Sequence, residues 1–140
     1  MNLEKHDSGS KMNFGFVHEN LSMYERSKFV IVPVPYECTT SYLKGTKNGP
    51  KKIIEASYEL ELYDQEMGSN IALMGIHTLN DIKSIDDPKQ MMDKIETTVK
   101  KLFDERKFPI MLGGEHTISI GGIAAADKAY DDLSLSLIHI

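Results

Sequence analysis

Apolar and polar positions follow two different periods along this chain. Short apolar runs rich in β-branched residues, or strict alternation over a few residues, predict strands, and apolar residues three or four positions apart predict helices. The predicted strands are 29–35, 71–76, 108–112 and 133–140. The predicted helices are 49–62, 88–103 and 117–130. This βαβαβαβ order predicts an α/β fold, a three-layer α/β/α arrangement around a mainly parallel sheet that is truncated after its fourth strand.

The predicted elements form one domain that follows an N-terminal arm. Residues 1–27 are expected to be an irregular arm, because loop-forming residues precede apolar side chains suited to docking on the body or on a partner subunit. Residues 28–140 carry all the predicted strands and helices and form a single α/β domain. Neither an internal repeat nor a low-complexity segment interrupts this domain.

Composition and charge indicate which kinds of molecule the chain is expected to bind. With 41% hydrophobic and 26% charged residues, the 140-residue chain has the ordinary balance of a soluble domain. A net charge of −5 without a cluster of Lys or Arg predicts no nucleic-acid partner and no membrane attachment. The single cysteine, Cys38, cannot form an internal disulfide, and we find neither a secretion signal nor a long apolar segment in the sequence. We therefore expect a cytoplasmic protein.

The strongest candidate chemistry follows the third predicted strand. Gly113 and Gly114 form a turn that brings Glu115 and His116 to the carboxyl edge of the sheet, where open α/β sheets bind ligands. From this spacing alone, His116 is either a capping or packing residue or a metal ligand, and Glu115 could hold an imidazole or the loop. The turn could also bind an anion at a helix N-terminus, although Glu115 places negative charge there.

Two other stretches at this edge are weaker candidates. The polar loop 36–47 is long for a βα connection, and it is either a binding loop or an ordinary surface loop. Its candidate pocket residues are Glu37, Thr39, Thr40, Ser41 and Tyr42. His77 follows the second predicted strand and has no neighbouring carboxylate motif. An alternative to an enzyme is therefore a non-catalytic binding or interaction module on the same fold, which would use the loop and the arm.

The stretch from Pro109 to Ile118 resembles the first metal motif of the ureohydrolases, the arginase and agmatinase family, usually Gly-Gly-(Asp/Glu)-His-(Ser/Thr). Four further stretches resemble the agmatinase branch, and motifs that occur in order are more specific than one motif. These stretches are 32–37, 39–50, 54–64 and 75–79. The likeness covers residues 14–140, so residues 28–140 resemble the N-terminal part of a single ureohydrolase-like α/β domain.

The resemblance implies an arginase-like fold and a hydrolase that uses two manganese ions (Mn2+) to activate water, cleave a guanidino C–N bond and release urea. It implies a small guanidino substrate such as agmatine, a place in polyamine metabolism, and a homo-oligomer in the complete protein. It also implies that His116 is a metal ligand, which Gly113, Gly114 and Glu115 support from the turn.

Two later motifs of that family, Asp-Ala-His-x-Asp and Asp-x-Asp, are missing from the sequence, and His139 falls where the resemblance implies a strand residue. We therefore expect no catalytic residue and one metal ligand within this chain, and no measurable turnover. Manganese should bind no more tightly than it does to a single exposed histidine. The strand predicted at 133–140 would have an unpaired edge, which predicts self-association or poor solubility.

Overall fold

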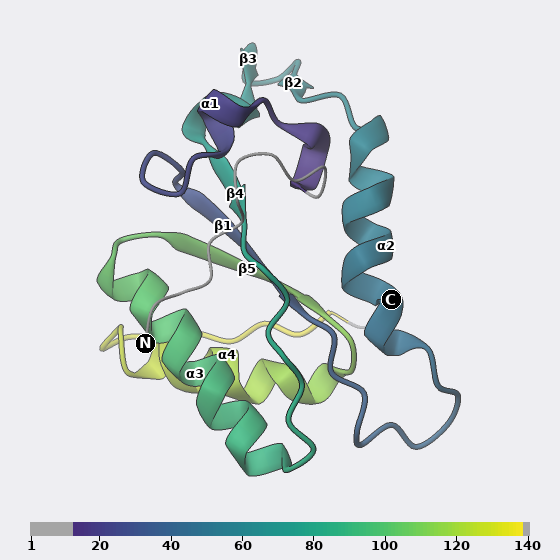
Figure 1. The fold of residues 1–140 in the computed structure, drawn as a ribbon. Helices are drawn as coiled ribbons and strands as arrows, with labels where there is room; N and C mark the ends of the chain where they lie inside the picture. Colours follow the sequence, from purple (N-terminus) through teal and green to yellow (C-terminus); the bar gives the residue numbers. More distant parts are fainter. Residues whose placement is uncertain (1–12, 139–140) are drawn as a thin grey trace.

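The computed structural model describes residues 13–138, and its centre is a three-stranded parallel sheet (Figure 1). The strands lie in the order β4 (Ile76–Thr78), β1 (Phe29–Val34) and β5 (Phe108–Gly113). Phe29 lies opposite Ile76 on one side and opposite Phe108 on the other. The predicted parallel sheet is confirmed, and β1 and β5 lie within one residue of their predicted ranges.

The middle strand, β1, contains Pro33, yet no backbone hydrogen bond between strands is lost at this residue. The backbone groups of Phe29 and Ile31 pair with β4, which ends opposite Ile31. Pro33 therefore lies past the end of β4, where its missing N–H breaks no ladder bond and its carbonyl accepts a hydrogen bond from the Ile82 N–H (2.9 Å). The apolar run thus continues as a strand through this proline.

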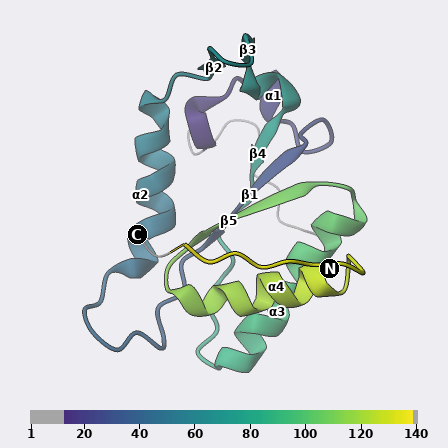
Figure 2. The same cartoon turned by 180° about the vertical axis from the view of Figure 1, so that it is seen from behind.

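Helices cover both faces of the sheet (Figures 1 and 2). Helices α3 (Pro88–Asp104) and α4 (Ser119–Asp127) lie on one face, and α2 (Gly49–Ala56) lies on the other. Val30 and Val32 belong to the core under α3 and α4, whereas Ile31 belongs to a second core on the opposite face. This alternation buries both faces of β1 and confirms the predicted α/β/α layers.

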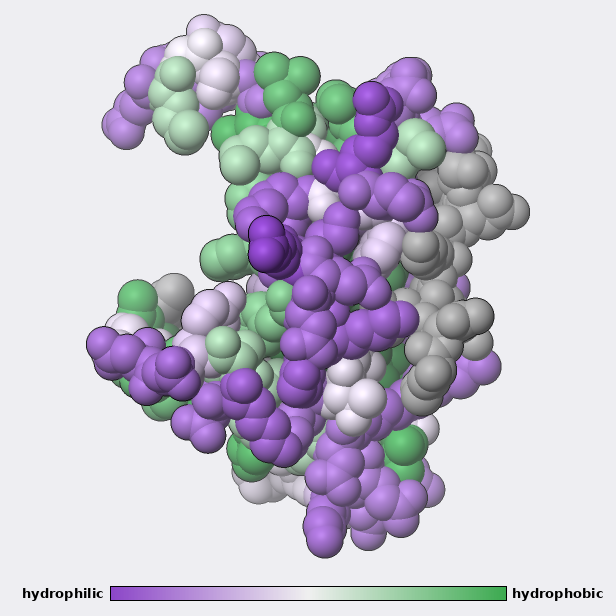
Figure 3. All heavy atoms as spheres, turned by 90° about the vertical axis from the view of Figure 1, so that its left-hand side faces the viewer, coloured by the Kyte–Doolittle hydropathy of each residue, from purple (hydrophilic) through white to green (hydrophobic). Residues whose placement is uncertain are grey.

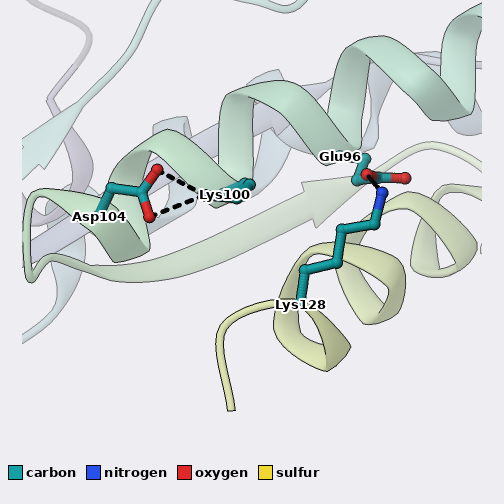
Figure 4. A network of polar contacts seen from close by, with 4 residues as sticks. All are labelled: Glu96, Lys100, Asp104 and Lys128. Atoms are coloured by element: carbon teal, nitrogen blue, oxygen red, sulfur yellow. Dashed lines mark hydrogen bonds and ion pairs between the residues drawn. The ribbon is translucent and has the colours of Figure 1, made fainter.

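Helix α3 begins as the sequence predicts, whereas α4 begins later. The Asp87 carboxylate caps α3 by accepting a hydrogen bond from the Gln90 N–H (2.7 Å). The chain forms a 3₁₀ turn at His116–Ile118 before α4 starts. At the far end of α4, Lys128 forms an ion pair with Glu96 of α3, which joins the two helices (Figure 4).

The strand predicted at 71–76 is wrong in its position. Ile71–Met74 forms a 3₁₀ turn, and β4 follows it. The side chain of Asn70 starts this turn by accepting a hydrogen bond from the Ala72 N–H (2.9 Å), and Gly75 leaves it with a φ of +77°. Local capping therefore overrides the strand preference of the apolar run.

The fourth strand predicted at 133–140 is also wrong for the residues that the structure describes. Residues 131–138 form no strand and pass across α4 in Figure 2. Alternating Leu and Ser residues favour a strand only where a neighbouring strand pairs with them, and no strand within residues 13–138 pairs with this exposed segment. His139 and Ile140 lie outside the described residues.

The described part of the N-terminal arm, residues 13–27, packs beside β4. It contains the short helix α1 (Glu19–Ser22), and its side chains Val17 and Tyr24 are buried. The Phe14 N–H donates a hydrogen bond to the hydroxyl of Thr78 in β4 (3.0 Å). The arm is therefore held by the same sheet that carries the candidate site. The first 12 residues of the predicted arm lie outside the described part of the chain.

A small antiparallel hairpin, β2 (Tyr63–Asp64) and β3 (Ser69–Asn70), projects at the top of Figure 1. Figure 3 shows the left-hand side of that view, where an upper and a lower projection border a hollow in the outline.

Among the described residues, we find no helix with the length and apolar character that crossing a membrane requires.

Candidate functional site

Close backbone contacts hold the turn that carries the candidate metal ligand. β5 ends at Gly113, and the Gly114 N–H donates a hydrogen bond to the Val34 carbonyl (3.1 Å). A Cβ atom on Gly114 would lie 2.0 Å from the carbonyl oxygen of Tyr36, and one on Gly113 would lie 2.6 Å from Cδ1 of Ile118. Neither position therefore accommodates a larger residue without a shift of the backbone or the core.

Glu115 is buried, and it joins this turn to the loop that follows β1. Its two carboxylate oxygens accept hydrogen bonds from the Thr39 N–H (3.2 and 3.0 Å) and from the Thr39 hydroxyl. The Thr117 hydroxyl lies 3.1 Å from the Thr39 hydroxyl and donates to it, since the Thr39 proton is directed at Glu115. The Glu115 N–H donates to the Tyr36 carbonyl (3.0 Å). The hydrogen bonds that Thr39 donates thus offset the free-energy cost of burying the Glu115 carboxylate.

His116 is exposed beyond the carboxyl end of β5. It is the first residue of the 3₁₀ turn, and the buried side chain of Ile118 anchors the last. An exposed imidazole on a fixed backbone can bind a divalent cation or exchange a proton. Across residues 13–138, no three His, Cys, Asp or Glu side chains gather as a metal site. The position therefore has the donor chemistry of one metal ligand, without a complete set.

The loop 36–47 is organised mainly by one of its own carboxylates. Glu37 accepts hydrogen bonds from the Gly45 N–H, the Thr46 hydroxyl (3.1 Å) and the Lys47 N–H (3.2 Å). Desolvation by itself would raise the pKa of Glu37, but these hydrogen bonds and the charge of Lys47 outweigh it and lower that pKa. The loop therefore closes on itself at neutral pH.

The candidate pocket residues of this loop do not converge on one point. Thr39 reaches the His116 turn through Glu115, as described above. The Thr40 hydroxyl instead accepts a hydrogen bond from Lys44 Nζ (2.9 Å), and Ser41 and Tyr42 are exposed. The structure thus brings Thr39 to the candidate site and leaves Ser41 and Tyr42 at the surface.

His77 lies within β4 and is buried, with 4% of its surface exposed. Its Nδ1 atom lies 2.7 Å from the carbonyl oxygen of Ser22, and its ring meets the Tyr24 ring edge-on at a centroid distance of 5.2 Å. These contacts join the sheet to the N-terminal arm. His77 is therefore a packing residue between these two parts of the fold.

Sequence reasoning missed the contact between Glu115 and Thr39. The two residues are 76 positions apart, so no local pattern links them. The topology does contain a usable signal, because β1 and β5 are adjacent parallel strands and the loops after such strands leave the sheet side by side. A carboxylate after one strand and a hydroxyl after the other can then form a hydrogen bond.

Comparison with known proteins gives a consistent result. A sequence model described as the arginase family matches residues 27–140. An N(1)-aminopropylagmatine ureohydrolase from Synechocystis is 36% identical over 116 residues, which cover 79% of this chain and 38% of that protein. An agmatinase from Halalkalibacterium halodurans is 36% identical over 120 residues, which cover 85% of this chain and 41% of that protein.

The fold agrees with these sequence matches. The crystal structure of agmatine ureohydrolase from Thermoplasma volcanium has a TM-score of 0.70 and 30% sequence identity to this chain. The match covers 89% of this chain and 39% of that one. The chain thus spans about two fifths of the length of the curated relatives that it matches.

Proposed function

Because the chain belongs to the arginase family, we propose that it forms the N-terminal part of an agmatinase-like ureohydrolase in which His116 is one ligand of a dimanganese site. The exposed imidazole of His116, held beyond β5 on a turn fixed by Gly114 and Glu115, is the observation that carries this proposal. Relatives named for agmatine and aminopropylagmatine support a guanidino substrate.

Hydrolysis of a guanidino group needs a strong nucleophile and positive charge near the reacting carbon. Bound manganese would supply both, by acidifying water and by stabilising developing negative charge. His116 would contribute a neutral imidazole nitrogen to the ligand set, which is a common metal-ligand role for histidine. Because its side chain lies at the surface, it can meet ligands that come from other loops.

Glu115 and Thr39 have a supporting role in this proposal. Their hydrogen bonds fix the loop 36–47 relative to the turn that carries His116. A ligand on a fixed backbone needs less reorganisation when a metal binds, which favours binding and correct geometry. We assign neither residue a contact with the substrate, and we assign no catalytic residue within this chain.

A chimera tests whether this chain can supply its part of the site. In it, residues 27–140 would replace the matching part of the Halalkalibacterium halodurans agmatinase. We expect the folded chimera to release urea from agmatine when manganese is present. His116→Ala should lower kcat at least about a hundredfold, because loss of a metal ligand weakens both metal binding and water activation.

The control variant is Lys89→Ala, which removes an exposed side chain from the first turn of α3 and should leave kcat unchanged. Circular dichroism would establish that each variant is folded. A folded chimera without activity, or one in which His116→Ala keeps full activity, would contradict the proposal.

A further inference from the structure

The loop 36–47 runs from the end of β1 towards α2, and it contacts the turn that carries the candidate metal ligand in two places (Figure 1). Near the beginning of the loop, the Thr39 N–H donates a hydrogen bond to the Glu115 carboxylate (3.0 Å). Just past its end, Gly49 lies against the carbonyl oxygen of Gly113, where a Cβ atom would be only 2.8 Å away. One loop therefore holds the backbone of this turn from two sides.

Glu37 joins the two ends of this loop. Its carboxylate accepts hydrogen bonds from the Gly45 N–H, the Thr46 hydroxyl (3.1 Å) and the Lys47 N–H (3.2 Å). The chain continues from these donors through the 3₁₀ turn Thr46–Asn48 directly into α2. The start of α2 is therefore tied to the beginning of the loop through one carboxylate.

Gly45 is the residue at the far end of this connection whose backbone conformation depends on the absence of a side chain. Its φ is +129°, which residues with a Cβ atom rarely adopt. No atom beyond its chain neighbours lies within 4 Å of the place that a Cβ atom would take. Gly45→Ala would therefore act through backbone strain alone, and it would open the connection at the end opposite Glu37.

We propose, on the basis of the function proposed above, that Glu37 is a positioning residue for the metal ligand His116 and acts through the loop 36–47. With the Glu37 carboxylate in place, the loop makes both of its contacts with the turn at the same time. Without it, the two contacts become independent, and the backbone that carries His116 samples more conformations. Manganese binding then has to order this backbone, which weakens it.

Hydrogen exchange in the 140-residue chain tests the connection itself. Glu37→Gln keeps the size of the side chain but removes its charge, so the amides of Gly114 and Glu115 should exchange at least about fivefold faster. Gly45→Ala should have the same effect. The control is Gly68→Ala in the β2–β3 hairpin, where φ is +61° and a Cβ atom would likewise meet nothing within 4 Å. This control should leave both amides unchanged.

The chimera described above tests the consequence for the metal site. Glu37→Gln and Gly45→Ala should each raise the manganese concentration for half-maximal rate at least about fivefold, since a partner that orients a metal ligand is typically worth about 10–100-fold in affinity. The KM for agmatine at saturating manganese should stay within about twofold, because Glu37 does not contact the substrate in this proposal. The double variant should not exceed the larger single effect, since both changes open the same connection. Gly68→Ala should change neither value.

Two results would overturn the role of Glu37. One is a folded Glu37→Gln chain in which the Gly114 and Glu115 amides keep their exchange rates. The other is an active chimera in which Glu37→Gln leaves the manganese requirement unchanged, or in which Gly68→Ala raises it as much. A chimera that is inactive, or that does not respond to His116→Ala, would contradict the proposed function instead, and the exchange rates of the 140-residue chain would then decide the role of Glu37.

Discussion

Gly114 and Gly122 are two glycines of the same region that differ in what surrounds them. A Cβ atom on Gly114 would meet the backbone of Tyr36, with its closest contact at 2.0 Å. A Cβ atom on Gly122, in α4, would meet only the end of the Met111 side chain, at 2.8 Å. Backbone cannot move without disturbing the turn, whereas a methionine end can rotate away.

We therefore expect Gly114→Ala to lower the free energy of unfolding by at least about 2 kcal/mol, through overpacking against backbone. Gly122→Ala should change it by less than about 1 kcal/mol, because the gain in helix propensity offsets the displacement of Met111. Urea denaturation followed by circular dichroism measures both values. Equal effects of the two substitutions would show that the contact of Gly114 with Tyr36 does not control stability.

The two histidines after predicted strands show how far residues can be interpreted from sequence. His116 was predicted to lie at the sheet edge because a strand that ends in two glycines leaves the next side chains there, and the structure places it at the surface. The burial of His77 could not be predicted. It results from contacts with Ser22 and Tyr24 of the arm, and no local pattern encodes where that arm docks.

Among the connections between elements, the corner between α3 and β5 fixes the N-terminal arm. Lys107 Nζ donates hydrogen bonds to the carbonyl oxygens of Tyr24 (2.7 Å), Glu25 (3.2 Å) and Ser27 (2.8 Å). The Tyr24 hydroxyl donates to the Glu105 carboxylate. Burial raises the pKa of Tyr24, and the hydrogen bond and negative charge of Glu105 raise it further, so this hydroxyl remains a donor at neutral pH.

Replacement of Lys107 by methionine tests this connection. Lys107→Met keeps an unbranched side chain over the Tyr24 ring but removes the charged donor, so it should lower the free energy of unfolding by about 1–3 kcal/mol. Amides of residues 14–27 should also exchange faster with solvent. The control is Lys101→Met, which removes a surface ion pair with Glu105 (3.8 Å) and should cost less than about 1 kcal/mol. Unchanged exchange in Lys107→Met would contradict this assignment.

Helices and strands were predicted well where the hydrophobic pattern of the segment agreed with the contacts that the segment makes in the fold. β1, α3 and β5 each combine a clear period with a cap, proline or glycine at an end, and each was found close to its predicted range. The strands predicted at 71–76 and 133–140 failed for a different reason. Asn70 and Gly75 impose a turn on residues 71–74. Residues 133–138 pair with no strand of the described chain, and the pattern of a segment cannot indicate whether a partner strand lies beside it.

At the scale of the whole molecule, this chain matches about two fifths of the length of its curated relatives. The part that it matches includes the Gly-Gly-Glu-His turn, and residues 13–138 bring no three metal-binding side chains together. A single imidazole binds divalent cations weakly, because tight sites need several ligands that converge. We therefore propose that the remaining ligands come from outside residues 13–138.

The isolated 140-residue chain should accordingly release no urea from agmatine. In a manganese titration followed by paramagnetic line broadening in NMR spectra, His116 should broaden no more readily than His18, an exposed histidine of the arm. His116→Ala and His18→Ala are the matched variants that assign each effect. A stoichiometric manganese site with a dissociation constant on the order of 1 µM, lost in His116→Ala alone, would contradict this prediction.

The parallel strands beside β1 stop at different heights. Regular pairing with β4 ends opposite Ile31, and pairing with β5 continues to Val34. His77 lies opposite Val30, whereas Gly113, which precedes the His116 turn, lies opposite Val34, four residues farther along β1. At a rise of about 3.3 Å per residue, this separation amounts to about 13 Å along the strand direction. His77 and His116 are therefore too far apart along the sheet to share one ion.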